Sequence, residues 1–90
     1  MTREEMQELK RLAESATPGP WAEGLGDMVF AGPVKKARGS VSGGRGIVAR
    51  TDDDDFDDEQ NEANALYIAA ANPEAVLSLI ARIEELEAKR

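Results

Sequence analysis

Apolar residues recur at steps of three and four near the start of the chain, and this spacing predicts a helix over residues 1–16. The recurring positions share one helical face, and they are Met6, Leu9, Leu12, Ala13 and Ala16. Thr2 and Glu5 have the spacing of a capping box, in which each side chain binds a free amide of the first turn. The predicted helix is amphipathic, and we expect its apolar face to pack on a core.

Two further helices are predicted in residues 59–90, on either side of Asn72 and Pro73. Asparagine is a favoured N-cap, and proline suits the first helical position. The pattern of the first helix runs from about Asp57 to Ala71, and its inward residues are Ala65, Leu66, Ile68 and Ala69. The second carries a stripe typical of a short coiled coil, formed by Val76, Leu79, Ile80, Ile83 and Leu86. That stripe serves either packing within the chain or contact with another subunit.

Glycine and proline divide residues 17–51 into short runs that favour strands. Pro18 cannot continue a helix, so the chain turns there and an extended segment is expected to begin at Trp21. The runs DMVFAG and GIVAR are each typical of a short strand. Between them, Val34 and Val41 could supply a middle strand, but the surrounding glycines and serines favour a flexible loop. We predict two or three antiparallel strands, which need a helix or a partner on their apolar face.

These patterns predict a single α+β domain with an N-terminal helix, a small two- to three-stranded antiparallel sheet, and a C-terminal helical hairpin that covers the sheet. Its segments are the helix 1–16, the turn and sheet 17–51 with a basic glycine–serine loop, the acidic loop 52–58 and the two helices 59–90. A chain of 90 residues has a thin core. Because the apolar stripes exceed what so thin a sheet can cover, we predict a homo-oligomer, either a dimer or a higher assembly of dimers.

The composition argues against most enzymatic chemistry. The chain has no cysteine and no histidine, which removes disulfides, thiolate zinc sites, and the commonest metal ligand and general base. Ser40 and Ser42 therefore have no histidine to activate them. The acidic run DDDDFDDE fails as an EF-hand, because Asp58 stands where glycine is needed and Asn64 where glutamate is needed. We expect no catalytic residue, no metal site and no cofactor.

Charge is distributed unevenly along the chain. The formal net charge of −7 disfavours nonspecific binding to nucleic acids. Residues 52–62 contain acids and no base, whereas residues 33–50 contain bases and no acid. The acidic run is either a solvated helix start that the helix dipole favours, or a segment that imitates DNA phosphates and engages a basic partner. The N-terminus lacks an apolar signal region and no apolar run approaches membrane-spanning length, so we expect a cytoplasmic protein without membrane contact.

The basic segment KKARGSVSGGRG is a candidate anion site, because glycine amides and arginine forks suit phosphate oxygens. Phosphate contacts combined with base stacking are an economical way to hold a nucleotide. The candidate ligand-binding residues are Lys35, Lys36, Arg38 and Arg45 for the phosphates, Trp21 or Tyr67 for stacking a base, and Asn64 for a polar edge. In the alternative interpretation the segment is a mobile surface loop, and Trp21 caps the core.

Two blocks near the ends of the chain, LKRLAESATPGPW and EANALYIAAANPEAVLSLIARIEELE, carry a resemblance to a known family. Together they resemble the Ead family of small bacteriophage early-region accessory proteins and their actinophage relatives. The resemblance implies a phage or prophage origin and a non-enzymatic accessory role, and it supplies no catalytic residues. By analogy with anti-defence proteins of similar size, we expect an oligomer in the host cytoplasm that sequesters a small nucleotide-type signalling molecule. The alternative is an acidic interaction module or DNA mimic that engages a basic host protein.

Overall fold

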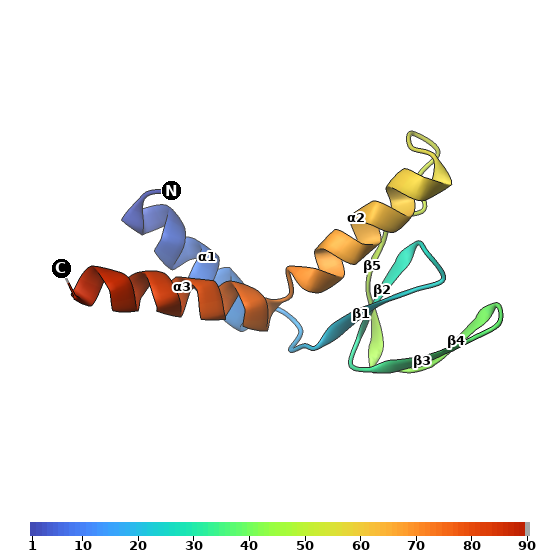
Figure 1. Cartoon of the computed structure of the whole chain (residues 1–90), viewed down its shortest axis with the longest axis horizontal. Helices are drawn as coiled ribbons and strands as arrows, with labels where there is room; N and C mark the ends of the chain where they lie inside the picture. Colours follow the sequence, from blue (N-terminus) through green and yellow to red (C-terminus); the bar gives the residue numbers. More distant parts are fainter. Residues whose placement is uncertain (90) are drawn as a thin grey trace.

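The computed structural model describes residues 1–89, which form three helices and two small antiparallel sheets (Figure 1). In chain order the elements are α1 (Arg3–Ser15), β1 (Trp21–Gly24), β2 (Met28–Ala31), β3 (Val34–Ala37), β4 (Ser40–Gly43), β5 (Gly46–Arg50), α2 (Asp58–Ala70) and α3 (Pro73–Ala88). The α+β class is confirmed, and so is the predicted order of one helix, strands and two C-terminal helices.

Each helix begins at a side-chain cap. Thr2 and Glu5 form the predicted capping box of α1, in which the Thr2 amide donates to Glu5 Oε1 at 2.8 Å and the Glu5 amide donates to Thr2 Oγ1 at 3.0 Å. Asp57 caps α2 and Asn72 caps α3, each by accepting a hydrogen bond from the amide three residues later. Pro73 occupies the start of α3, as predicted. These local signals explain why the helix boundaries follow from the sequence.

Strands β1, β2 and β5 form a sheet in the order β1–β2–β5, and α2 packs across it. The core between them contains Val29 of β2, which is fully buried, with Ala65 and Ala69 of α2. Small alanine side chains allow the helix backbone to approach the sheet closely. Partly buried residues surround this core, and they are Trp21, Val48, Ala49 and Ile68. Leu66, predicted to face inward, is instead 49% exposed.

The segment predicted as a flexible loop instead forms the hairpin of β3 and β4. Its turn lies between the paired residues Ala37 and Ser40, with Gly39 in the left-handed region at φ +66°. The half-buried Val41 packs over β1, because its Cγ2 lies 3.1 Å from where a Cβ on Gly24 would stand. The loop prediction was wrong because cross-strand pairing and this distant contact outweigh the local preference of glycine and serine.

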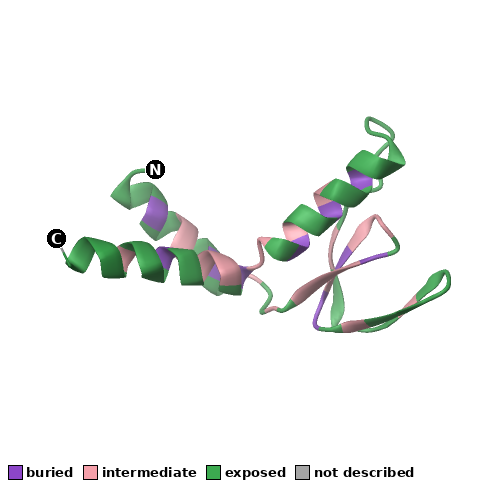
Figure 2. Ribbon diagram, viewed as in Figure 1, coloured by how far each residue is buried: buried purple, intermediate pink, exposed green. Residues whose placement is uncertain are grey.

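Helices α1 and α3 form an arm that points away from the sheet (Figure 1). The axes of α2 and α3 differ by 55° at the break between them, so α3 continues outward and packs on α1 instead of folding back on α2. The predicted hairpin of the last two helices is therefore opened, and α2 is the helix that covers the sheet. The start of α1 and the end of α3 lie toward the same end of the arm, so the two helices run in opposite directions and cross obliquely (Figure 1). The buried residues of the arm are Met6, Ala13, Pro73 and Ile80 (Figure 2).

The predicted stripe of α3 is only partly covered. Ile80 is buried and Val76 is half-buried, whereas Leu79, Ile83 and Leu86 are exposed. The molecule is correspondingly elongated, with extents of 51 × 29 × 19 Å. Within residues 1–89, no single helix has the length and apolar character needed to cross a membrane, and α2 with α3 meets those criteria only as a bent pair.

Candidate functional site

An acidic groove of about 600 Å³ lies between the β1–β2 turn, the loop before α2 and the first turns of α2. We call it the acidic groove, and its carboxylates are Asp27, Asp52, Asp53, Asp54, Asp58 and Glu62. Its other lining residues are Leu25, Gly26, Phe56 and Asn61. In the part of the chain that the structure describes, no lysine or arginine lines it. Its potential is therefore strongly negative, and it attracts cations.

Two acceptor atoms beside these carboxylates are buried without a hydrogen-bond donor. They are Asp27 Oδ1 and Asn61 Oδ1, which have no partner among the described residues. Asn61 is only 7% exposed, and its side-chain Nδ2 donates to the backbone carbonyl of Asp53 at 3.2 Å. The backbone carbonyl of Asn61 accepts a hydrogen bond from Thr51 Oγ1 at 2.8 Å. Asn61 thus joins the acidic loop to α2 and still keeps one acceptor unused. Buried polar atoms are normally paired, so this groove lacks a donor.

The groove suits an organic cation better than a metal ion. Among residues 1–89, no three carboxylates converge closely enough to hold a metal. A guanidinium presents five N–H donors in a planar fork, which can reach several dispersed oxygens at once. Phe56 and Leu25 also line the groove and are 53% and 51% exposed. Such apolar surface matches the hydrocarbon stem of lysine or arginine, and an aromatic ring attracts its charge.

A second groove of about 320 Å³ adjoins the first, and we call it the tyrosine groove. It brings together two of the predicted ligand residues, Asn64 and Tyr67, beside Arg50. Tyr67 is 73% exposed, and Asn64 Oδ1 accepts a hydrogen bond from Gln60 Nε2 at 3.1 Å. The remaining lining residues are Thr51, Asp52, Asp53, Phe56 and Ile68. The carboxylates in this groove oppose an anionic ligand, whereas Arg50 favours one.

The predicted phosphate-binding residues do not join this groove. Lys35 and Lys36 lie on β3, and Arg38 lies in the β3–β4 turn. The Lys36 ammonium pairs with Glu23 Oε1 at 2.9 Å. Arg45 Nη2 donates to the Pro18 carbonyl at 2.8 Å, so this side chain holds the turn before β1. The structure therefore does not assemble the predicted phosphate clamp around Asn64 and Tyr67.

Trp21 takes the structural role that the sequence left open. Its ring is half-buried against the core of Val29, Ala65 and Ala69, and its Nε1 donates to the Thr17 carbonyl at 3.0 Å. It lines neither the acidic groove nor the tyrosine groove. Trp21 consequently packs on the core at the point where the chain leaves α1, and a stacking role for its exposed part stays a prediction.

The Lys36–Glu23 pair predicts a measurable pH effect. The hydrogen bond from Lys36 is the largest cause that holds the pKa of Glu23 below its usual value, and a hydrogen bond from the Gly26 amide adds to it. Because the folded-state pKa is lowered, the pair's contribution to the free energy of unfolding is present above the unfolded-state pKa. That contribution is lost as the pH falls through the folded-state pKa. Lys36→Met is expected to raise the pKa of Glu23 in an NMR titration of its carboxyl carbon. Lys35→Met is the control and should leave that pKa unchanged; equal titration of Glu23 in all three proteins contradicts the pairing.

Sequence reasoning missed Asp27 and Asn61 as groove residues. One signal for Asn61 was present, because it precedes Ala65 and Ala69 by four and eight residues and shares their buried face of α2. A polar residue on an apolar helical face usually meets a specific partner. No comparable local signal marks Asp27, which follows the turn residues Leu25 and Gly26.

The chain was also compared with proteins of known family, function and structure. The predicted resemblance to phage early-region accessory proteins gains no further support there and stays a prediction. Comparison with family models, with curated proteins and with solved structures found no match.

Proposed function

We propose that this protein is a non-enzymatic interaction module that binds a basic segment of a partner protein in its acidic groove. The observation that carries the proposal is the combination, in one groove, of six carboxylates with two buried acceptors that lack a donor. A lysine or arginine side chain supplies the missing positive charge, and its N–H donors suit the carboxylates that line the groove. Hydrogen bonds to charged groups of this kind are stronger than those between neutral groups.

The partner's basic segment gains affinity from the shape of the groove as well as from its charge. Long-range attraction between an acidic protein and a basic partner accelerates their encounter and weakens as salt is added. Phe56 and Leu25 then cover the apolar stem of the bound side chain. A surface that only repelled anions would need neither the exposed ring nor the buried acceptors.

The tyrosine groove favours a second candidate function, the sequestration of a small nucleotide-type ligand. Asn64 and Tyr67 line one groove with Arg50, so a base stacked on Tyr67 would have a polar edge near Asn64 and a phosphate near Arg50. Asp52 and Asp53 in the same groove work against the phosphate. A role as a phage anti-defence protein in the host cytoplasm is part of this second proposal and rests on the resemblance described above.

Calorimetric titration with a short arginine-rich peptide tests the first proposal. A groove variant removes three charges, through Asp52→Asn, Asp54→Asn and Glu62→Gln. A control variant removes the same number outside the groove, through Asp55→Asn, Glu59→Gln and Glu87→Gln. We expect the groove variant to bind the peptide at least about tenfold more weakly than the control variant does. Equal weakening in both variants would show that only net charge matters, and it would overturn a groove site.

Native mass spectrometry with a panel of cyclic and linear nucleotides separates the two candidates. A nucleotide retained by the wild-type protein and lost on Tyr67→Ala supports sequestration. Retention that instead depends on Arg38 and Arg45 would restore the predicted clamp on the β3–β4 hairpin and its flank. A protein that retains no nucleotide and binds the basic peptide leaves the interaction module as the function.

A further inference from the structure

The folded chain exposes more surface than its mass requires. Its accessible area is 6444 Å², whereas a compact monomer of 9.7 kDa is expected to expose about 5,100 Å². Its radius of gyration is 15.4 Å, against about 12 Å for a compact domain of this length. The difference in area is about 1,300 Å², which exceeds the roughly 800 Å² that one subunit contributes to a standard interface. The chain therefore has enough uncovered surface for a stable contact with another molecule.

The arm carries several of the exposed apolar side chains of this surface. Leu79, Ile83 and Leu86 of α3 are 66%, 41% and 49% exposed, and their spacing of four and three residues makes one stripe. On α1, Leu12 is 50% exposed and lines a shallow groove with Met1 and Leu9. We call these six residues the arm face. The buried residues of the arm are too few to stabilise two helices alone.

The two halves of the arm face lie on the same side of the arm. Each residue of a helix advances about 100° around its axis. On α1, Leu9 and Leu12 therefore lie about 60° and about 120° around the axis from the buried Met6. On α3, Ile83 and Leu86 lie at the same angles from the buried Ile80, in the same rotational direction. Because the helices run antiparallel, equal rotations bring the two stripes to one side. The ion pair between Lys10 and Glu84, at 3.6 Å, closes the opposite side. The arm thus presents its exposed apolar side chains on one side, and on α1 they share that side with Glu4, Glu5 and Glu8.

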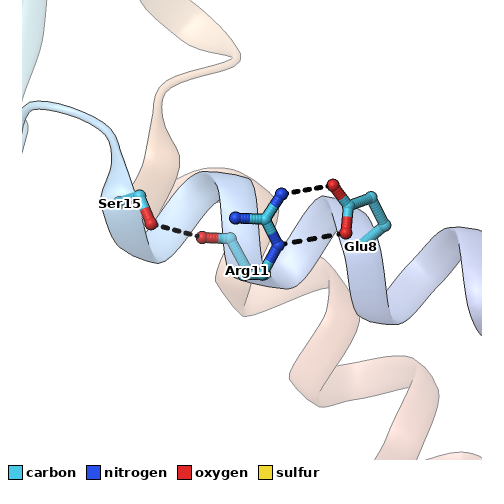
Figure 3. A network of polar contacts seen from close by, with 3 residues as sticks. All are labelled: Glu8, Arg11 and Ser15. Atoms are coloured by element: carbon cyan, nitrogen blue, oxygen red, sulfur yellow. Dashed lines mark hydrogen bonds and ion pairs between the residues drawn. The ribbon is translucent and has the colours of Figure 1, made fainter.

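The solvent side of α1 is polar (Figure 3). The Arg11 guanidinium donates twice to the Glu8 carboxylate, and Ser15 Oγ donates to the Arg11 carbonyl at 3.0 Å. These contacts lie on the side of α1 that faces away from α3. Two such helix pairs that pack face to face make a four-helix assembly.

We propose that the arm face binds the arm face of a second copy of this chain, so that two arms form a four-helix bundle. A second copy fits because the charges beside the face are opposite on balance. On α1, the carboxylates of Glu4, Glu5 and Glu8 line the groove, and Arg11 pairs with Glu8. On α3, Arg82 and Lys89 both pair with the single carboxylate of Glu85. A twofold arrangement that places α1 of one copy against α3 of the other brings the net negative charge of α1 to the net positive charge beside α3. The interface goes beyond the proposed function, because no arm residue lines the acidic groove.

Sedimentation equilibrium of the full chain tests the proposal. The wild-type protein is expected to be a dimer, and Leu79→Gln combined with Ile83→Gln should weaken dimerisation about a hundredfold or more. Leu66→Gln is the control, because the exposure of Leu66, 49%, lies between those of Leu79 and Ile83, but Leu66 lies on α2. Circular dichroism checks that each variant keeps its helices, and peptide titration checks that the acidic groove still binds. A double variant that stays folded and binds peptide as a monomer separates the failure of the interface from failure of the proposed function.

Cysteine pairing gives a second measurement that does not depend on a weakened fold. The chain has no cysteine of its own, so single variants Leu12→Cys and Ile83→Cys can be mixed and oxidised. We expect disulfide-linked dimers to form faster in the mixture than with either variant alone, because α1 of one copy faces α3 of the other. A wild-type monomer at every concentration, or a dimer that the double glutamine variant leaves intact, overturns the proposal. Equal cross-linking in all samples does so too.

Discussion

The variant Val29→Asp is expected to lose its cooperative unfolding transition. Val29 is fully buried on β2, where it contacts the core residues Ala65 and Ala69. A carboxylate there would be buried without a partner, at a cost of about 5 kcal/mol in the free energy of unfolding. That cost is comparable with the whole stability of a domain of this size. Thermal scans by circular dichroism, together with the dispersion of amide signals in an NMR spectrum, measure the loss.

Val29→Ala is the control for this variant. It removes two methyl groups and adds no charge, so we expect it to lower the free energy of unfolding by about 2 kcal/mol and to keep the fold. A Val29→Asp protein that unfolds at the same urea concentration as the wild type would contradict the position of Val29 in the core.

Trp21→Ala is expected to lower the free energy of unfolding by about 3 kcal/mol, at the low end for large aromatic side chains because the ring is only half-buried. The substitution removes both the contact of the ring with the core and its hydrogen bond to Thr17. Urea unfolding followed by far-ultraviolet circular dichroism measures this change, since the alanine variant has no tryptophan fluorescence.

Trp21→Phe separates the two contributions. It keeps most of the apolar surface and loses the Nε1 hydrogen bond, so its free energy of unfolding should fall by about 1 kcal/mol beyond any change in packing. If Trp21→Ala leaves the free energy of unfolding unchanged and instead removes ligand binding, Trp21 belongs to a binding site and its structural role is wrong.

Most elements of the fold follow from local signals in the sequence. Thr2 with Glu5 and Asn72 with Pro73 define helix starts through bonds that span only a few residues, so the sequence predicts them well. The direction of α3 after the break depends on which surface it can bury, and no local pattern contains that information. The hairpin of β3 and β4 was missed for the same reason, because Val41 packs on Gly24 from seventeen residues away.

The candidate site was predicted in part. Asn64 and Tyr67 share a groove because a spacing of three residues places them on one side of α2. Lys36 was predicted to bind a phosphate, but the packing of β3 beside β1 places its ammonium next to the Glu23 carboxylate, and the two form an ion pair. Asp27 reaches the acidic groove only because β1 pairs with β2, and the sequence pattern of each segment alone does not predict that pairing.

The 55° break between α2 and α3 has a consequence for how such a protein would capture its target. The break carries the arm away from the sheet, so a dimer formed through the arms would keep both acidic grooves free. Two equivalent grooves on one dimer can hold two basic segments of the same target, and the second binding step is then intramolecular. The high effective concentration of the second basic segment near the second groove would raise the overall affinity well above that of one groove. A dimer with two weak grooves would then select targets by the spacing between their basic segments, which a single groove cannot do.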